Sequence, residues 1–391
     1  MRTALVIFLG GLGDSPAERL VDEARLRASL DVVAAWQESS GGAAAAIVVT
    51  NDAAIFPGAG VPHGLIIDAD TGPFHFGHRL AGVIGRHDLD AVVYMGGGSL
   101  PFVDPPAFAD MATRLDAGVA VTNNPYSSDL VAFPVSPDVL AGVRTCSRDN
   151  ELARALQEQA GLAVEALPRT LLAQFDIDAP SDVAVLALVE AQLRVADGPA
   201  RRMSMRGEGG GIGPALADYL SSLDVDFSRH QAALPLFLDR SAEILVAGRV
   251  GSHAWAYLER ETACRVRLFA EERGMEADGR AAAGEARSLL GYYLEAAGGE
   301  RFFETLGELC DAAFVDSRVI LAHRRIEASR EDRFLSDLGR WQEINDPFLS
   351  DFTRAALAAP VPVLLGGHSL VSGGLMALNE LAWALRDAGR L

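Results

Sequence analysis

Cysteine and positive charge are both scarce in this sequence of 391 residues. The three cysteines, Cys146, Cys264 and Cys310, are odd in number and widely spaced, which argues against a disulfide framework or a zinc site and fits a reducing cytoplasm. The 34 basic and 53 acidic residues give a formal net charge of −19. Phosphate backbones and anionic membranes would be repelled, so we expect no nucleic-acid partner and no membrane surface as the main partner.

Long apolar runs are missing as well. The first apolar run is too short for a signal peptide, and the apolar stretch from Ala355 is interrupted by Pro360, Pro362 and several glycines. We therefore expect a soluble, cytoplasmic protein whose partners are small molecules, and the sequence leaves a homo-oligomer open. With 49% apolar and 22% charged residues, the chain is long enough for two domains with full hydrophobic cores.

A glycine loop follows the first predicted strand. The apolar segment 3–9 leads into Gly10-Gly11-Leu12-Gly13, and an amphipathic helix is expected from Ala17 to Gln37. Glycines between a strand and a helix let the backbone approach phosphates, and the helix N-terminus favours negative charge. The same residues also suit a tight turn with no ligand.

Polar residues follow the next predicted strands, at 44–50, 65–68, 91–95 and 118–122. Ligands of open α/β sheets bind beyond the carboxyl ends of strands, so these residues are candidates for a site. A His-x-x-His spacing at a helix start also suits a metal, but no third ligand is evident, and an Asn-Pro cluster also suits a turn. The candidates, in chain order, are Asn51, His75, His78, Arg79, Gly98, Ser99, Asn123, Asn124, Tyr126, Ser128 and Asp129.

Two aspartates precede a predicted apolar helix. Asp176 and Asp178 flank Ile177, so on an extended segment both carboxylates would project to the same side. Two carboxylates can share a hard divalent cation such as Mg²⁺ with the phosphates of a nucleotide. Pro180 would then open the helix. The alternative is that the aspartates only cap this helix and solvate a turn.

Three short motifs in this order resemble the nucleotidyltransferases of GT-A-like fold, in particular the molybdopterin-guanylyltransferase-like and CMP-sugar-synthetase-like families. The segment 9–13 resembles their NTP-binding loop, Ser99-Leu100-Pro101 their Gly-Asp-x-Pro loop, and 176–182 their closing motif. The resemblance covers roughly residues 1–195. It implies an α/β, Rossmann-like domain with a mostly parallel sheet. It also implies transfer of NMP from an NTP to a phosphorylated or carboxylated small-molecule acceptor, with Mg²⁺ or Mn²⁺ as the cofactor.

The resemblance also implies a role for each candidate. The triphosphate and nucleotide would contact Gly10, Gly11, Gly13, Arg19, Asn51 and Gly98. The metal would be held by Asp176 and Asp178, and the acceptor would face the polar residues of 75–79 and 123–129. The catalytic set is then Arg19, Ser99, Asp176 and Asp178.

Two departures from the family pattern bear on catalysis. Ser99 stands where the family has its metal-binding aspartate, so it would bind metal weakly or through water. The chain offers Arg19, Arg25 and Arg27 near the glycine loop but no phosphate-gripping lysine. A catalytically degenerate protein that binds or senses a nucleotide or sugar nucleotide is therefore one alternative, and a GT-A glycosyltransferase is another. Ser369 resembles a hydrolase nucleophile, but Val371 replaces the required glycine and no histidine follows it.

The second half of the chain predicts a second α/β module. We place a nucleotidyltransferase-like domain at 1–197, a glycine-rich linker at 198–214 and the second module at 215–391. Strands are expected at 242–247, 264–269, 318–322 and 361–365, with a long helical region at 280–310. Their ends predict a second polar site formed by Arg249, His253, Glu271, Glu272, Arg273, His323, His368 and Ser369.

Overall fold

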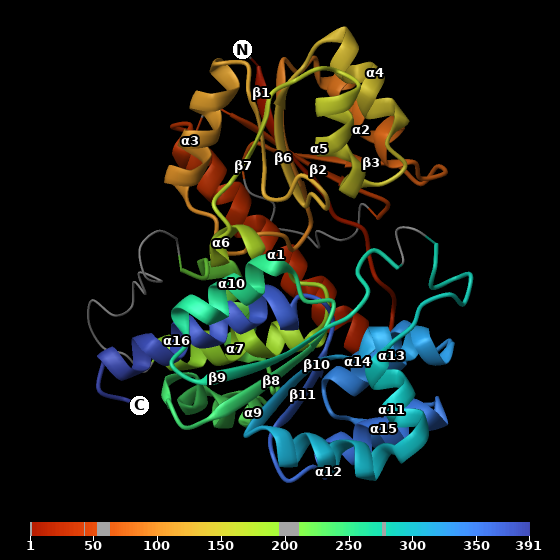
Figure 1. Ribbon diagram of the computed structural model, residues 1–391. Helices are drawn as coiled ribbons and strands as arrows, with labels where there is room; N and C mark the ends of the chain where they lie inside the picture. The colour runs from red at the N-terminus through yellow and green to blue at the C-terminus, as the bar shows by residue number, and fades with distance from the viewer. Residues whose placement is uncertain (1, 43, 53–62, 195–210, 276–278) are drawn as a thin grey trace. The chain divides into compact units, whose positions relative to one another are not determined.

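The computed structural model describes residues 2–42, 44–52, 63–194, 211–275 and 279–391 (Figure 1). The predicted linker lies outside these residues except for 211–214. The chain packs into two compact units. The first contains Met1–Leu12, Asp22–Gln174 and Gly213–Leu216, and the second contains Gly13–Val21, Phe175–Ile212 and Ala217–Leu391. Residues 175–194, which the sequence analysis placed in the first domain, therefore pack with the second unit.

The first unit is built on a seven-stranded sheet of order β3-β2-β1-β4-β6-β5-β7. All neighbouring strands are parallel except β6, which is antiparallel to β4 and β5. The predicted α/β class with a mostly parallel sheet is confirmed. The strands are β1 (Thr3–Phe8), β2 (Ala45–Thr50), β3 (Leu65–Ala69), β4 (Ala91–Gly96), β5 (Ala120–Thr122), β6 (Leu130–Pro134) and β7 (Val164–Ala166).

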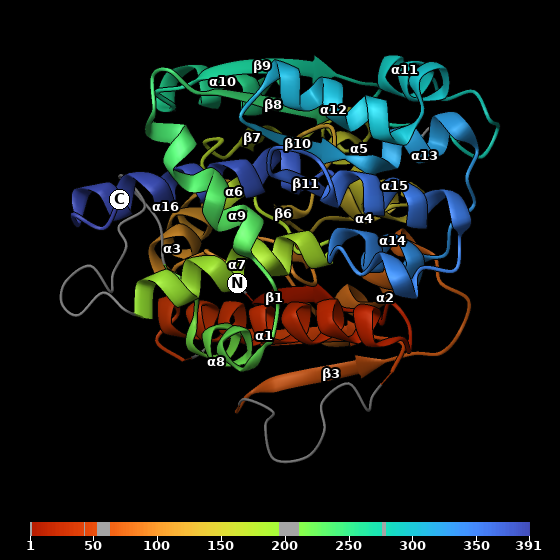
Figure 2. The same ribbon diagram turned by 90° about the horizontal axis from the view of Figure 1, so that it is seen from below.

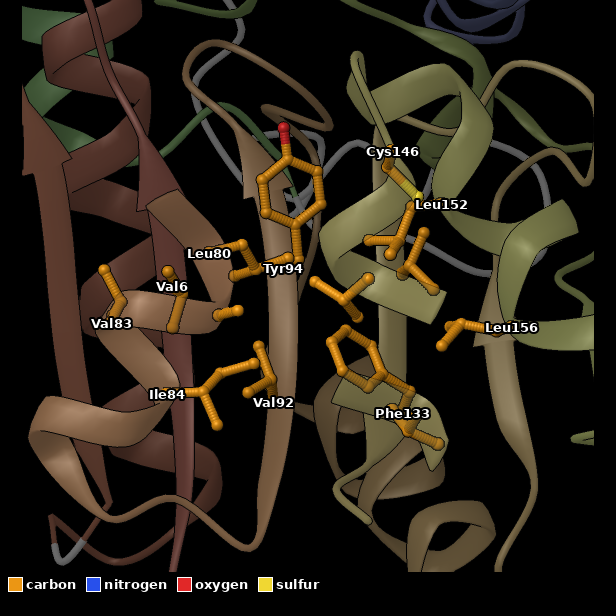
Figure 3. Packing of buried hydrophobic residues seen from close by; sticks show 14 of the residues in the cluster. Val6, Leu80, Val83, Ile84, Val92, Tyr94, Phe133, Cys146, Leu152 and Leu156 are labelled. Carbon is orange, nitrogen blue, oxygen red and sulfur yellow. The ribbon is translucent and has the colours of Figure 1, made fainter. Parts of the chain in front are cut away.

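Helices cover both faces of this sheet. Alternate residues of β1 show why, since Val6 packs with α2 (Phe76–His87), α4 (Pro137–Thr145) and α5 (Leu152–Glu158), whereas Ile7 packs with α1 (Pro16–Ser39) and α3 (Pro105–Asp116). Figure 3 shows the first of these cores, with Val6, Val92 and Tyr94 of the sheet against side chains of α2. Strands buried on both faces carry near-continuous apolar runs, which is why these runs could be predicted.

Cys146 belongs to this core (Figure 3). Burial raises the pKa of its thiol to about 11, with a further contribution from the charge of Glu151. The thiol therefore stays neutral at physiological pH and acts as a packing group.

The second unit contains a four-stranded parallel sheet of order β11-β10-β8-β9 (Figure 2). The predicted second α/β module is thereby confirmed. Its strands are β8 (Glu243–Gly248), β9 (Arg265–Ala270), β10 (Ala312–Asp316) and β11 (Val363–Gly366). The remaining α-helices of the chain are α6 (Leu171–Gln174), α7 (Pro180–Arg194), α8 (Pro214–Ser222), α9 (Ser228–Ala233), α10 (Ser252–Glu261), α11 (Leu289–Ala297), α12 (Gly299–Leu309), α13 (Ser317–Arg324), α14 (Arg330–Asp337), α15 (Pro347–Leu357) and α16 (Leu375–Asp387). Short 3₁₀ turns lie at Asp149–Glu151, Leu234–Leu238 and Trp341–Glu343, and a π-helical turn lies at Leu370–Gly374.

Two predictions for the second unit were wrong. The segment 318–322 is not a strand but part of α13, because Asp316 accepts a hydrogen bond from the Arg318 N–H at 3.2 Å and starts a helix directly after β10. A short apolar run such as 319–321 fits a buried helix as well as a strand. The helical region expected at 280–310 begins only at Leu289 and breaks at Gly298, whose φ is 78°.

Within the part of the chain that the structure describes, no helix combines the length and the apolar character that crossing a membrane requires.

His230 of α9 is a buried histidine whose two ring nitrogens have no hydrogen-bond partner within the described residues. Burial lowers its pKa from 6.5 to about 4, against the opposing charge of Asp226. Below about pH 6.5 the imidazole is therefore protonated in the unfolded chain but stays neutral in the folded chain. The free energy of unfolding consequently decreases as the pH falls from about 6.5 towards 4.

We predict that His230→Leu removes this acid sensitivity. The difference in free energy of unfolding between the variant and the unaltered chain should be about 2 kcal/mol more favourable to the variant at about pH 5 than at about pH 7.5. Urea unfolding at both pH values measures the difference, and exposed His63→Leu is the control. An equal effect of His230→Leu at both pH values would contradict the prediction.

Candidate functional site

The strand order of the first unit reverses between β1 and β4. From β1 the chain continues to β2 and β3 on one side, and then returns to place β4 on the other side. Such a switch point separates the loops that follow the two strands and is the usual ligand site of an open α/β sheet. The glycine loop after β1 and the Ser99 loop after β4 both begin here.

Arg25 of α1 holds these two loops together. Its Nε donates to the carbonyl oxygen of Gly97 at 2.9 Å, and its Nη1 donates to that of Gly10 at 3.1 Å. The Gly97 N–H in turn donates to the Phe8 carbonyl oxygen at 2.8 Å. Only glycine fits position 97, because a Cβ there would lie 2.5 Å from a methyl group of Leu9. The two loops are therefore fixed by backbone contacts and one guanidinium.

The glycine loop presents backbone donors. Gly10 and Gly11 are exposed, and their N–H groups donate to none of the residues that the structure describes. Asn51 lies beside them, since its Oδ1 is 3.8 Å from the position that a Cβ on Gly10 would take. The next amide, of Leu12, is already used and donates to Asp22 at 2.7 Å. Two adjacent backbone donors are thus available to an anion.

The Ser99 loop has a constrained backbone. Gly98 has a φ of 92° and Leu100 a φ of 51°, so two of three consecutive residues are left-handed. A leucine in this region is rare and is retained where the surrounding structure imposes it, often at functional sites. Ser99 itself is 4% exposed, and its N–H donates to the Gly96 carbonyl oxygen at 3.2 Å.

The residues predicted at 75–79 take part in local contacts. Arg79 bonds to Asp68 and to Asp70, and Asp68 also binds Arg86. Burial tends to raise the pKa of Asp68, but hydrogen bonds from Arg86 and His87 and the charges of both arginines hold that pKa below its ordinary value.

The two histidines of this segment lie against each other. The His75 ring accepts a hydrogen bond from the His78 N–H at 3.4 Å and so caps α2, and the two rings stack 4.1 Å apart. A role for His75, His78 and Arg79 in acceptor binding stays a prediction.

The cluster 123–129 forms the connection between β5 and β6. Asn123 brackets it, because its Oδ1 accepts from the N–H groups of Asp129 and Leu130 and its Nδ2 donates to Asp129. Asn124 accepts from the Tyr126 N–H, as in an Asx turn. These contacts are those of the turn alternative. Strand β6, which follows this connection, was not predicted from the sequence, and a role for the cluster in acceptor binding stays a prediction.

Other members of this cluster differ in exposure. Ser128 is buried and donates to the carbonyl oxygen of Asp149 at 3.0 Å, whereas the Tyr126 side chain is 84% exposed. Tyr126 is thus the large side chain that this connection presents to solvent.

Phe74 is a residue that sequence reasoning missed. Its side chain is 72% exposed, although its ring centroid lies only 6.3 Å from that of Phe8 at the end of β1. Phe8 itself packs edge-on against Phe76 and Tyr94. The signal was available, because an aromatic side chain directly after Gly72-Pro73 stands in a loop between β3 and α2.

Four residues of the predicted site belong to the second unit: Gly13, Arg19, Asp176 and Asp178. Arg19 pairs with Asp14 at 3.5 Å and is largely exposed. Ile177 is buried while Asp178 is exposed, which agrees with the predicted alternation. The helix cap here is Asp182, which accepts from the Asp178 and Ala179 N–H groups at 2.9 Å each.

The aspartate pair offers two hard oxygen donors, which suit Mg²⁺ or Mn²⁺. Among the described residues, no three His, Cys, Asp or Glu side chains gather closely enough to hold a metal by themselves. The remaining ligands would have to come from elsewhere, as the predicted sharing with nucleotide phosphates requires.

The second sheet has its own switch point, between β8 and β10. Arg249 follows β8 and makes a two-pronged contact with Asp316 at the end of β10, with its Nε 2.6 Å from Oδ2 and its Nη2 3.1 Å from Oδ1. Gly248 is required here, because its φ is 129° and a Cβ would lie 2.3 Å from the Asp316 Cβ. The predicted second polar site thus contains a buried ion pair at the switch point.

Further buried charges surround this pair. Arg318 binds Asp337 through both terminal nitrogens, at 2.7 and 2.6 Å. Burial would raise the pKa of Asp316, but the charge of Arg249 keeps that pKa below its ordinary value. Burial, reinforced by the charge of Asp178, raises the pKa of Asp182 well above the ordinary range. Carboxyl groups with opposite shifts in one cluster are typical of functional sites.

Other residues of the predicted second polar site have local partners. Glu271 accepts from the Ser288 hydroxyl at 2.8 Å, and His323 Nδ1 accepts from the Ser288 N–H at 3.2 Å. Glu272 pairs with Arg280. Glu271 and His323 thereby anchor the start of α11.

The comparisons with known proteins found similar solved structures over about half of the chain, at low TM-scores. No protein-family model matches the chain. No curated protein matches it either. A cytidylyltransferase from Leptospira borgpetersenii is similar at 11% identity and a TM-score of 0.32, covering 48% of this chain and 85% of its own. CMP:2-keto-3-deoxy-manno-octonic acid synthetase in complex with CTP is similar at 16% identity and a TM-score of 0.32, covering 49% and 99%.

A Mycobacterium tuberculosis protein in complex with manganese is similar at 18% identity and a TM-score of 0.32, covering 46% of this chain and 96% of its own. At these TM-scores we draw no conclusion about activity from the likeness.

The buried Asp182 gives a testable expectation. Because the pKa of Asp182 is raised in the folded chain, the folded form holds its proton more tightly, and stability falls as the pH rises above the ordinary carboxyl value of 3.8 towards the raised one. Asp182→Asn keeps an oxygen acceptor for the two N–H groups without the charge. The free energy of unfolding of this variant, relative to that of the unaltered chain, should therefore be higher at about pH 8 than at about pH 4.5.

Asp182→Ala is the matched variant. It removes the charge together with both hydrogen bonds, and should lower the free energy of unfolding by about 2 kcal/mol relative to Asp182→Asn. Urea unfolding of both variants measures this. Equal stability of the two variants would show that the cap contributes nothing.

Proposed function

We propose that the first unit binds a nucleoside triphosphate at the β1/β4 switch point and that the protein transfers its NMP group to a phosphorylated or carboxylated small molecule. The observation that carries the proposal is the pair of exposed amides of Gly10 and Gly11, which donate to none of the described residues and lie next to a second loop that Arg25 holds in place. Backbone amides at such a point bind phosphate oxygens without needing a lysine.

Exposed side chains near these loops support a nucleotide rather than a bare phosphate. Asn51 lies beside Gly10 and offers an amide for hydrogen bonding. Phe74 presents an exposed aromatic face next to Phe8, on which a base can stack. Its packing against Phe8 limits the freedom that stacking would remove.

The reaction needs positioning and charge neutralisation more than a protein nucleophile. An oxygen of the acceptor attacks the α-phosphorus, the bond between the α- and β-phosphates breaks, and pyrophosphate leaves with the electron pair. In this proposal Gly13 and Arg19 contact the triphosphate, and Asp176 and Asp178 hold Mg²⁺ or Mn²⁺. The metal supplies neutralisation of the phosphate charge when it is bound.

Residues from 75–79 and 123–129 face the acceptor in the same proposal. Tyr126 is the best placed of them because its side chain is exposed, whereas Arg79 is engaged by two aspartates.

A binding or sensory protein without catalysis is the second candidate. The burial of Ser99 favours it, because a 4% exposed serine stands where the resembling family has a metal-binding aspartate. Pyrophosphate release in the presence of Mg²⁺, tested with each NTP over a panel of phosphorylated and carboxylated acceptors, separates the candidates. Metal-independent nucleotide binding without turnover would select the second.

We predict that Phe74→Ala weakens nucleotide binding roughly tenfold, because it removes one base-stacking surface. Tyr126→Ala is the control, since it removes another exposed aromatic side chain of the same unit and should leave NTP affinity unchanged. Isothermal titration with each NTP measures both. Equal affinities for all three proteins would contradict a base site at Phe74.

Asp178→Ala should abolish the Mg²⁺-dependent part of nucleotide affinity. Asp218→Ala, which removes another exposed carboxylate of the second unit, should leave it intact. Titrations with and without Mg²⁺ give the comparison. Retention of the Mg²⁺ effect in Asp178→Ala would show that the aspartate pair is structural.

A further inference from the structure

The second unit carries a strand, a glycine turn and a helix in succession at its own switch point. Strand β8 ends at Gly248, the turn Arg249-Val250-Gly251 follows, and α10 begins at Ser252. Gly251 is the N-cap residue with an extended backbone, and no side chain caps the helix. This feature lies wholly within the second unit and goes beyond the nucleotide site proposed for the first.

Two side chains that can carry positive charge converge on Gly251. A Cβ at this position would lie 2.7 Å from the Cε1 of His253 and 3.0 Å from an Nη1 of Arg273. His253 belongs to α10, whereas Arg273 comes from the segment after β9, the neighbouring strand. The absence of a side chain on Gly251 thus lets an imidazole and a guanidinium pack closely against the start of the helix.

His368 approaches the same charges from the end of β11. Its Nδ1 is buried and has no hydrogen-bond partner within the described residues. Burial lowers the pKa of His368, and the charges of Arg249 and Arg273 lower it further, against Asp316 and Asp178. A π-helical turn begins directly afterwards at Leu370, a feature often found at functional sites.

Arg249 completes the group. Asp316 engages its Nε and Nη2, while its Nη1 donates to none of the described residues. The side chain is 19% exposed. The ion pair therefore orients Arg249 and leaves the N–H groups of Nη1 for a ligand.

We propose that this cluster, formed by Gly251, His253, Arg273, His368 and Arg249, binds the phosphate group of a phosphorylated small molecule. A tetrahedral phosphate accepts hydrogen bonds from several directions, which suits donors arriving from the ends of three different strands and from a helix N-terminus. A planar carboxylate would use fewer of these donors. The site is separate in sequence from the glycine loop at 10–13, and it belongs to a different unit from Gly10 and Gly11.

The test uses the full chain and inorganic phosphate. Isothermal titration should show binding to the unaltered protein. Gly251→Ala would push the His253 and Arg273 side chains away from the start of α10. It should weaken binding roughly tenfold or more, which corresponds to losing one charge-assisted hydrogen bond. The matched control is Gly367→Ala at the end of β11, where the nearest atom to a new Cβ is 3.9 Å away; it should bind phosphate as the unaltered chain does.

A second variant and a second readout keep the test independent of folding. Arg273→Gln should weaken phosphate binding without adding an atom at position 251. Addition of phosphate should also shift the Cε1 proton resonance of His368, assigned by its loss in His368→Gln. Unchanged phosphate affinity in both Gly251→Ala and Arg273→Gln, or no His368 shift on phosphate binding, would overturn the proposal.

Two further measurements distinguish a phosphate from a carboxylate ligand, and the second unit from the first as the place of binding. Equal affinity for malonate would show that the ligand class is carboxylate, and the proposal of a phosphate would be wrong. Phe74→Ala should leave phosphate binding unchanged. Loss of phosphate binding in that variant would assign the phosphate to the first unit and overturn the proposal, whereas failure of NTP binding alone would leave it standing.

Discussion

The charge of Asp316 is the constraint on which the arrangement of the second unit depends. This carboxylate is fully buried, and it binds the Arg249 guanidinium and the N–H of Arg318. It thereby joins the end of β8 to the end of β10 and starts α13. A buried carboxylate left without its partner is far more destabilising than the pair is stabilising. The geometry of this sheet edge therefore requires Arg249, and Gly248 allows the two strands to approach closely enough.

At the switch point of the first unit, the two loops are joined with fewer charged groups. At its switch point the contacts run between backbone groups, and the guanidinium of Arg25 binds two carbonyl oxygens. The exposed amides of the glycine loop remain as the main donors there. The two sheet edges thus differ in chemistry: one presents neutral backbone donors and an aromatic face, and the other presents guanidinium and imidazole groups. Such edges would select ligands by different means.

Most strands of the first sheet could be predicted from the sequence, because parallel strands buried on both faces are continuous apolar runs. The prediction failed where an apolar run was too short to distinguish a strand from a helix, and where a polar cluster suited both a turn and a pocket. Strand β6 was missed, and the polar connection before it is a turn that Asn123 closes by accepting from the N–H groups of Asp129 and Leu130. The segment 318–322 was misassigned because the helix cap comes from Asp316, a residue that also serves the ion pair.

The site was predicted in part, for a similar reason. The glycine loop and the second polar cluster could be found, because glycines and charges at strand ends stand out in a sequence. The packing of residues 175–194 with the second unit could not be predicted. In α7 the residues from Pro180 to Glu190 are all buried, and a continuous buried run does not indicate which part of the chain packs against it. Phe74 was overlooked because exposure cannot be read from the residue type.

The whole chain contains no lysine, and all 34 basic residues are arginine, among them Arg25, Arg249 and Arg318. Each of these arginines contacts two or more acceptors through a planar fork, which a compact ammonium group could not reproduce. Their charge also persists at any pH that the fold survives. In practical terms, no side chain offers a primary amine, so acylating labels and amine-directed cross-linkers have no side-chain target, and guanidinium-directed chemistry becomes the means of mapping its cationic surfaces.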